Sequence, residues 1–220
     1  MKTKRFDILT IFPHIFDSYL GESLFKRAIH KKIISITVHD LRAFAQGKHK
    51  KVDDRPFGGG PGMVLQLEPI YRAVTRLQTR SSKKTRTILF STRGAVFNAA
   101  TAQRLAKYDR LILICGRYEG VDERVAQHIA DEEISLGSYV LSGGELPALI
   151  VTEAVSRFLP GFLGKTESLE EKKGSYPVYS RPVDFLPSLR RGKKSAKWSV
   201  PTELLSGNHA KIKAWRQRQL

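Results

Sequence analysis

The stretch Leu111-Ile-Leu-Ile-Cys-Gly-Arg-Tyr-Glu-Gly, residues 111–120, decides the fold class because an apolar run ends directly in a loop with two glycines. A run of this length that is rich in branched apolar residues is typical of a strand covered on both faces. Similar runs predict further strands over residues 6–11, 33–38 and 87–90. Apolar residues recur with a helical period elsewhere, which predicts helices over residues 13–28, 68–77, 99–107, 121–129 and 146–158. Strands that alternate with helices indicate an α/β domain with a largely parallel sheet.

The balance of charged residues favours a polyanionic partner. Lysine and arginine number 38 against 21 aspartates and glutamates, which gives a formal net charge of +17. Such an excess concentrates phosphates near the surface and supports binding through counterion release, although solubility alone would also account for it. We therefore expect nucleic acid as a partner.

The sequence predicts a cytoplasmic protein with no membrane partner. No stretch approaches the roughly 20 apolar residues that span a bilayer. The apolar run over residues 6–11 is short and carries Asp7, so we interpret it as a strand rather than a secretion signal. Cys115 is the only cysteine, which excludes a disulfide within the chain.

Changes in composition predict three parts along the chain. Residues 1–160 hold all the expected strands and most of the helices, as one domain. Residues 161–201 are polar and then strongly basic without an apolar period, which is typical of a flexible loop or linker. Residues 202–220 form a short basic region with a helical pattern.

Three glycine-rich stretches, over residues 57–63, 115–120 and 135–147, are the candidates for a binding site. None has the lysine of a P-loop or the glycine spacing of a dinucleotide fold. Taken singly, each is more often a simple turn. Glycine also permits close approach of the backbone to a flat ligand, so three such loops together favour a site built from main-chain atoms.

Six long motifs resemble those of the bacterial tRNA (guanine-N1)-methyltransferases, the TrmD family of the SPOUT superfamily. The motifs lie in order along nearly the whole chain, at residues 52–63, 115–124, 139–148, 155–161, 179–182 and 204–210. The resemblance implies an α/β fold with a C-terminal trefoil knot, which spacing alone could not have shown. It also implies transfer of a methyl group from S-adenosylmethionine to N1 of the guanine at tRNA position 37, immediately 3′ to the anticodon.

The resemblance implies that the methyl donor lies between three loops. Main-chain groups in the last loop would bind adenine, and glycines would allow its close approach. Thr92 stands where the family commonly has proline, a mild departure. The implied donor-binding residues are Leu89, Phe90, Ser91, Gly116, Tyr118, Glu119, Leu136, Gly137, Ser138, Tyr139, Val140, Leu141, Gly143, Gly144 and Pro147.

The chemistry of guanine sets two further requirements. N1 carries a proton, so transfer needs a general base and a cation near O6 to stabilise the developing negative charge. Arg157 matches the catalytic arginine of the family and suits the second role, the alternative being an arginine that is merely solvated at a helix end. Lys172 stands where the family has the aspartate that acts as the base, so we expect Glu171, or Glu170, to serve instead. The alternative for both glutamates is that they are solvated loop charges.

The resemblance also implies a homodimer whose active sites are shared between subunits, a tRNA partner gripped at its anticodon arm, and a need for Mg²⁺. The position of the Mg²⁺ ion is unknown, since the six histidines show no ligand spacing and Asp53 and Asp54 lack further ligands. Residues 202–220 match only the start of the family's C-terminal tRNA-binding domain, as a remnant. The expected RNA contacts are Asp53, Arg55, Arg181, Lys193, Lys194, His209 and Arg216.

Two other functions compete with methyl transfer to tRNA. A degenerate relative would bind tRNA without efficient transfer, an alternative supported by Lys172 and the short C-terminal region. A different SPOUT enzyme would act on rRNA, but the detailed match over residues 52–63 argues against it.

Overall fold

The computed structural model describes residues 2–78, 84–164, 174–187 and 196–219. The chain divides into two compact units, Met1–Thr166 and Glu167–Leu220, which we describe separately.

A five-stranded parallel sheet forms the centre of the first unit, in the order β2-β1-β6-β5-β7. The strands are β1 (Lys4–Thr10), β2 (Ile34–Asp40), β5 (Thr85–Val96), β6 (Arg110–Ile114) and β7 (Glu132–Ser135). All four predicted strands are present, so the prediction of an α/β fold with a largely parallel sheet is confirmed. Strand β7 was not predicted, because Glu-Glu-Ile-Ser contains no apolar run.

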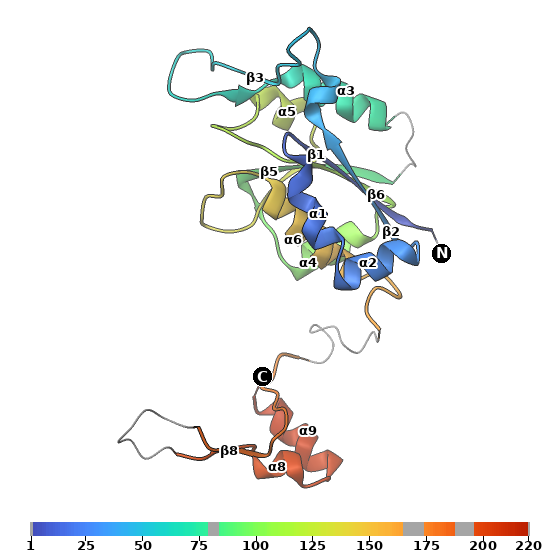
Figure 1. The fold of residues 1–220 in the computed structure, drawn as a ribbon, viewed down its shortest axis with the longest axis vertical. Helices are drawn as coiled ribbons and strands as arrows, with labels where there is room; N and C mark the ends of the chain where they lie inside the picture. Colours follow the sequence, from blue (N-terminus) through green and yellow to red (C-terminus); the bar gives the residue numbers. More distant parts are fainter. Residues whose placement is uncertain (1, 79–83, 165–173, 188–195, 220) are drawn as a thin grey trace. The chain divides into compact units, whose positions relative to one another are not determined.

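Helices cover both faces of this sheet, as Figure 1 shows. Helices α3 (Leu67–Gln78) and α5 (Glu123–His128) lie on one side. Helices α2 (Ser23–His30), α4 (Ala99–Ala106) and α6 (Glu145–Arg157) lie on the other. Each side has its own apolar core, and β6 contributes alternately to both, with Leu111 and Leu113 on the α6 side and Ile112 and Ile114 on the α3 side.

The predicted single helix over residues 13–28 is wrong in detail. The structure has a 3-10 helix η1 (Pro13–Phe16) and a short α1 (Asp17–Leu20) before α2. The chain turns at Gly21, and Glu22 is extended, which separates α1 from α2. The other four predicted helices correspond to α3, α4, α5 and α6. Asn98 caps α4 by accepting a hydrogen bond from the Thr101 amide over 2.9 Å, as the sequence predicts.

A small hairpin places the first glycine-rich stretch beside the second. Strands β3 (Asp53–Asp54) and β4 (Val64–Leu65) pair antiparallel and flank the loop of residues 55–63. The Leu65 amide donates to the Gly120 carbonyl over 3.0 Å, and the Glu119 amide donates to the Met63 carbonyl over 3.0 Å. Two of the three predicted loops are therefore joined by their backbones.

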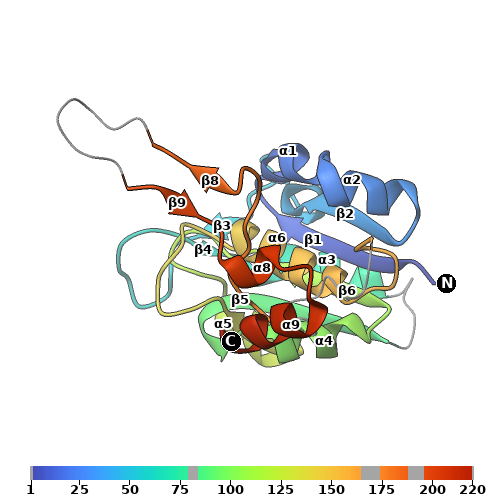
Figure 2. The same cartoon turned by 90° about the horizontal axis from the view of Figure 1, so that it is seen from below.

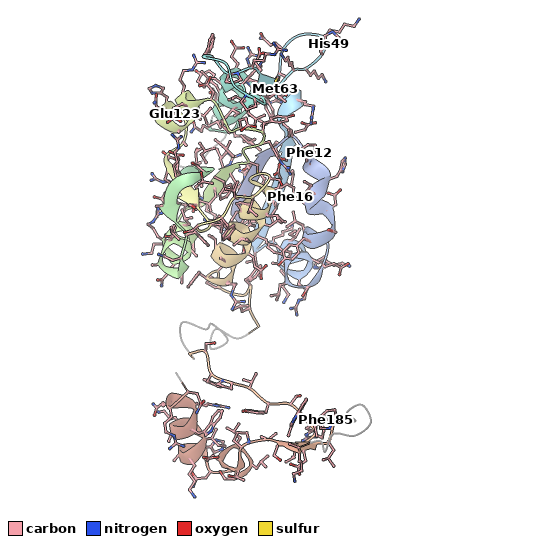
Figure 3. All side chains as sticks on the ribbon, turned by 90° about the vertical axis from the view of Figure 1, so that its left-hand side faces the viewer. Phe12, Phe16, His49, Met63, Glu123 and Phe185 are labelled. Carbon is pink, nitrogen blue, oxygen red and sulfur yellow. The ribbon has the colours of Figure 1, made fainter. Side chains whose placement is uncertain are left out.

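The second unit contains a hairpin and two helices (Figure 2). Strands β8 (Asp184–Phe185) and β9 (Trp198–Ser199) pair antiparallel, with Phe185 on this hairpin (Figure 3). Helices α8 (Thr202–Leu205) and α9 (His209–Gln217) contact each other. Asn208 caps α9, and Trp215 is buried with its ring 6.2 Å from that of Tyr179. This small core holds α9 in place.

None of the helices in the described parts of the chain is long and apolar enough to cross a membrane. The trefoil knot and the three-part division at residues 160 and 201 stay predictions.

Candidate donor-binding site

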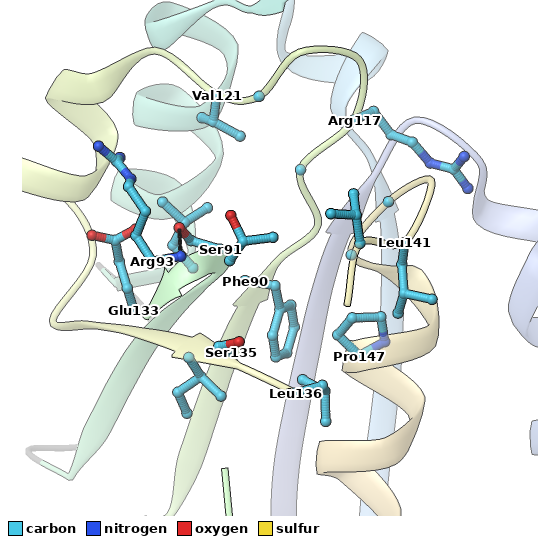
Figure 4. Close-up of a pocket in the computed structure, with 18 of the residues that line it drawn as sticks. Phe90, Ser91, Arg93, Arg117, Val121, Glu133, Ser135, Leu136, Leu141 and Pro147 are labelled. Atoms are coloured by element: carbon cyan, nitrogen blue, oxygen red, sulfur yellow. Dashed lines mark hydrogen bonds between the residues drawn. The ribbon is translucent and has the colours of Figure 1, made fainter. Parts of the chain in front are cut away.

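A cavity of about 560 Å³ opens at the carboxyl ends of β6 and β7 and beside residues 89–93 of β5. The loops that follow β6 and β7 form two of its walls, as expected for a ligand site in an open parallel sheet, and residues within β5 form another. Figure 4 shows that apolar side chains, among them Phe90, Leu136, Leu141 and Pro147, gather on one side of it. Arg93 and Glu133 lie on the other side. The cavity therefore has an apolar part and a charged part.

Strand β5 is interrupted where it meets the cavity. Ile134 of β7 pairs first with Phe90 and then with Ala95, so residues 91–94 leave the sheet and return. The return requires glycine at position 94, since a Cβ there would lie 2.6 Å from the backbone of Glu133. The excursion forms one wall of the cavity.

The loop after β7 supplies backbone groups to the cavity. Gly137 has φ +149°, a conformation that favours glycine. Within the described part of the chain, the amides of Tyr139, Val140 and Leu141 donate to no partner. Backbone donors left in this way are available to a ligand.

Gly144 closes the floor of the cavity against the loop after β6. Its amide donates to the Gly116 carbonyl over 2.9 Å. A Cβ at position 144 would lie 2.6 Å from Cα of Cys115, and one at position 143 would lie 2.3 Å from Nε of Arg117. Gly144 therefore allows two loops to pack backbone to backbone, and Gly143 leaves room for the side chain of Arg117.

A buried carboxylate locks these loops together. Glu145, at the start of α6, is 1% exposed. It accepts hydrogen bonds from Arg117 Nε over 2.9 Å and from Thr10 Oγ1 over 2.7 Å. Arg117 also lies over the ring of Phe12, with Cζ 4.7 Å from the ring centroid. Sequence reasoning missed this cluster, and the only signal was a glutamate directly after the paired glycines.

Tyr118 lies at the rim with a strained backbone. Its φ of +62° is unusual for a residue other than glycine, and such strain often accompanies functional sites. Burial raises the pKa of the Tyr118 hydroxyl, and the neighbouring carboxylate of Asp53 raises it further. Asp53, expected to contact RNA, is therefore close to the donor-binding residues.

Four further charged residues line the cavity, of which only Glu119 was predicted. Arg93 and Glu123 form an ion pair at 2.5 Å. Glu119 fills the space over Gly62, where a Cβ would lie 2.5 Å from its Cγ. Glu133 has one carboxylate oxygen that is buried without a donor in the described structure.

The structure brings most of the predicted donor-binding residues together. The cavity is lined by Leu89, Phe90, Ser91, Gly116, Tyr118, Glu119, Leu136, Tyr139, Val140, Leu141, Gly143, Gly144 and Pro147. Gly137 and Ser138 belong to the same loop without lining the cavity. Sequence reasoning did not assign a role to the lining residues Arg93, Arg117, Glu123 and Glu133.

The expected catalytic and RNA-contacting residues lie elsewhere. Arg157 is half-buried at the end of α6, about 18 Å along the helix axis from Glu145 at 1.5 Å per residue. Asp53 and Arg55 belong to the β3–β4 region, and Arg181, His209 and Arg216 to the second unit. Glu170, Glu171, Lys193 and Lys194 lie outside the described residues.

No group of three potential metal ligands occurs among the described residues. Asp54 instead pairs with Lys51 at 3.1 Å, and the hydrogen bond from the Arg55 amide, followed by this contact, lowers the Asp54 pKa. The described residues therefore do not identify a position for the expected Mg²⁺.

Comparison with known proteins identifies the class to which this fold and cavity belong. The family model described as tRNA (Guanine-1)-methyltransferase TrmD matches residues 4–220. The chain therefore belongs to the TrmD family.

Its relatives include two proteins named tRNA (guanine-N(1)-)-methyltransferase. The protein from Dehalococcoides mccartyi is 45% identical over 98% of this chain and 85% of its own length. The protein from Clostridioides difficile is 45% identical over 98% of this chain and 91% of its own length. The solved structure of the tRNA (m1G37) methyltransferase from Aquifex aeolicus is 44% identical, with a TM-score of 0.78 over 96% of this chain and 87% of that one.

Proposed function

We propose that this chain is a tRNA (guanine(37)-N1)-methyltransferase, which transfers a methyl group from S-adenosylmethionine to N1 of the guanine 3′ to the anticodon. The observation that carries the proposal is the cavity, whose walls include residues of two of the six motifs that carry the family resemblance, those at 115–124 and 139–148. Every relative described above bears the name of this activity. None of them supports the alternative of a tRNA-binding protein without transfer.

The cavity fits the methyl donor. The free amides of Tyr139, Val140 and Leu141 offer hydrogen bonds to the edge of an adenine ring, and the apolar side chains beside them cover its faces. The close packing at Gly144 keeps side chains out of the floor. When bound, S-adenosylmethionine supplies a methyl group on a positively charged sulfur.

The chain's own residues must then handle the proton and charge of guanine. We assign Arg157 to the guanine O6, where its forked N–H groups stabilise negative charge as the N1 proton leaves. We assign the general base to Glu171, with Glu170 as the alternative, since a protonated lysine at position 172 cannot accept a proton.

The distance between Arg157 and the cavity supports an active site shared between two copies of the chain. Leu146, Ile150 and Arg157 follow one stripe of α6, at spacings of four and seven residues. Leu146 is 54% and Ile150 45% exposed, which leaves an apolar surface on this stripe. If two copies pair through α6 in antiparallel fashion, the end of one helix lies beside the start of the other. The partner's Arg157 then reaches the cavity.

The remaining assignments follow from the substrate. We propose that Asp53, Arg55, Arg181, Lys193, Lys194, His209 and Arg216 contact the anticodon arm of tRNA, and that transfer depends on Mg²⁺ at a site not yet located. An enzyme with this substrate would act in the cytoplasm.

Radiolabelled S-adenosylmethionine with unmodified tRNA transcripts tests the proposal. We expect transfer to a transcript with guanine at position 37 and none to a transcript with adenine there. Arg157→Ala and Glu171→Ala should each lower the rate by at least about a hundredfold, the scale of acid–base or charge-stabilising groups. Binding of donor and tRNA without transfer by the unaltered protein would favour the alternative.

A further inference from the structure

We propose that Glu133 makes the donor cavity selective for net positive charge, so that the cationic methyl donor binds more tightly than the neutral product. This inference rests on the proposed function and assigns a role to a residue that the sequence motifs do not single out.

Two carboxylates of the cavity have no ion-pair partner among the described residues. Arg117 is paired with the buried Glu145 at 2.9 Å, and Arg93 is paired with Glu123 at 2.5 Å. In the described residues, neither Glu119 nor Glu133 forms an ion pair. These charges together leave the cavity with a net charge of about minus two when its carboxylates are ionised.

Glu133 is the less solvated of these two carboxylates. Its residue is half-buried, and its Oε2 atom is buried without a hydrogen-bond donor, whereas Glu119 is exposed. Arg93 is attracted to Glu133 at longer range but donates its hydrogen bond to Glu123. A buried carboxylate oxygen without a donor is unfavourable, and a positive ligand nearby would relieve this cost.

The backbone fixes the position of Glu133 at the wall of the cavity. Glu133 belongs to β7, paired with Leu89 of β5, and residues 91–94 pass over its main chain so closely that only glycine fits at position 94. Its side chain points to the face of the sheet opposite that of Glu132, which binds Arg86 and Arg104. Glu133 and Arg93 lie together on the charged side of the cavity (Figure 4).

The methyl donor and the product that remains after transfer differ in net charge, and a charged cavity binds them differently. S-adenosylmethionine carries a sulfonium, an ammonium and a carboxylate, for a net charge of plus one. S-adenosylhomocysteine, which remains after transfer, has a thioether in place of the sulfonium and is neutral overall. An uncompensated carboxylate favours the first ligand and so assists release of the second.

Calorimetric titration of the protein with each ligand, in the absence of RNA, tests the inference. We expect the unaltered protein to bind S-adenosylmethionine more tightly than S-adenosylhomocysteine. Glu133→Gln should weaken the binding of S-adenosylmethionine by about tenfold, which is the scale for loss of one charge near a cation in a partly solvated site. The same substitution should weaken the binding of S-adenosylhomocysteine much less. Glu133→Asp, which keeps the charge, should retain the preference.

Glu22→Gln is the matched control, because it removes an exposed carboxylate that precedes α2 and does not line the cavity, and it should change neither affinity. If the unaltered protein binds both ligands equally, or if Glu133→Gln weakens both to the same extent, charge selection is wrong while the proposed function stands. If neither ligand binds, the proposed function itself fails. Should Glu133→Gln not fold, the salt dependence of the two affinities in the unaltered protein replaces it, and an equal dependence contradicts the inference.

Discussion

Arg117 donates a hydrogen bond to Glu145 over 2.9 Å, and this contact joins the loop after β6 to the start of α6. The Glu145 side chain is 2% exposed, so the contact is nearly free of solvent. Because Thr10 of β1 donates to the same carboxylate, three distant segments meet at one group.

We expect Glu145→Ala to destabilise the fold by about 3 kcal/mol, since it leaves Arg117 and Thr10 without their shared acceptor. The loops should also lose their fixed separation, and donor affinity should fall with stability. Urea unfolding and calorimetric titration measure the two effects. Glu22→Ala, at an exposed position, should have little effect on stability or on donor affinity. If the two variants behave equally, Glu145 does not hold the loops together.

Gly144→Ala should destabilise the protein by about 1–3 kcal/mol and impair donor binding, because the added Cβ meets the backbone of Cys115 at 2.6 Å. Gly164→Ala is a close control, since its Cβ meets no atom within 4 Å and neither glycine has a positive φ. Thermal unfolding with and without S-adenosylmethionine distinguishes them. A Gly144→Ala protein that the donor stabilises as much as the unaltered protein would contradict the packing argument.

Ile150→Glu should shift a dimer toward monomers, because it places a charge in the exposed apolar stripe of α6. Sedimentation measures the shift, with Tyr71→Glu on α3 as an exposed control. Donor binding should persist in the monomer, whereas methyl transfer should be lost.

Mixing two inactive variants tests the shared site directly. Arg157→Ala and Gly144→Ala remove different halves of it, so a mixed dimer retains one site with both halves intact. Activity that reappears after the two proteins are unfolded and refolded together supports sharing, and a mixture as inactive as its components refutes it.

Lys4 predicts a pH dependence of stability. Burial lowers the pKa of its ammonium to about 7, although the nearby charge of Asp109 opposes the shift. The unfolded chain therefore binds more protons than the folded chain between pH 7 and about 10.5. The Lys4 contribution to stability should rise with pH in this window, by at most about 1.4 kcal/mol per pH unit.

Lys4→Met removes the titrating group and keeps an unbranched side chain of similar length. The difference in unfolding free energy between the unaltered protein and this variant, measured from pH 6 to about pH 10, isolates Lys4 from other groups. We expect the difference to move in favour of the unaltered protein above pH 7. A constant difference would show that Lys4 titrates normally.

The sequence predicted four of the five strands of the sheet and two of the glycine-rich loops that line the cavity, because both signals are local. Apolar runs and glycine pairs are visible within about ten residues, as in the run that ends at Cys115. The Glu145 cluster was not predictable in this way, since Thr10 and Glu145 are 135 residues apart and neither has an unusual neighbourhood. Strand β7 was missed because it contains no apolar run. Its Glu132 is accommodated by arginines from other elements, which no local pattern reveals.

The roles of Arg157 and Glu171 rest on resemblance rather than on local chemistry. Within a single chain, Arg157 lies at the far end of α6 from the cavity. No rule based on sequence spacing would therefore place Arg157 at this site. Their assignment depends on how two copies of the chain assemble. No pattern in the sequence of one chain reveals that assembly.

The interruption of β5 has a consequence for how this cavity can be altered. Since Ile134 pairs with the strand on both sides of residues 91–94, the register of the sheet depends on glycine at position 94 and not on the side chains of residues 91–93. Substitutions at Ser91, Thr92 and Arg93 can therefore reshape the wall facing the ligand while the strands keep their partners. Substitutions at these three positions would readily confer resistance to inhibitors that depend on their side chains. Few substitutions would confer resistance to compounds that bind the main chain of the opposite loop.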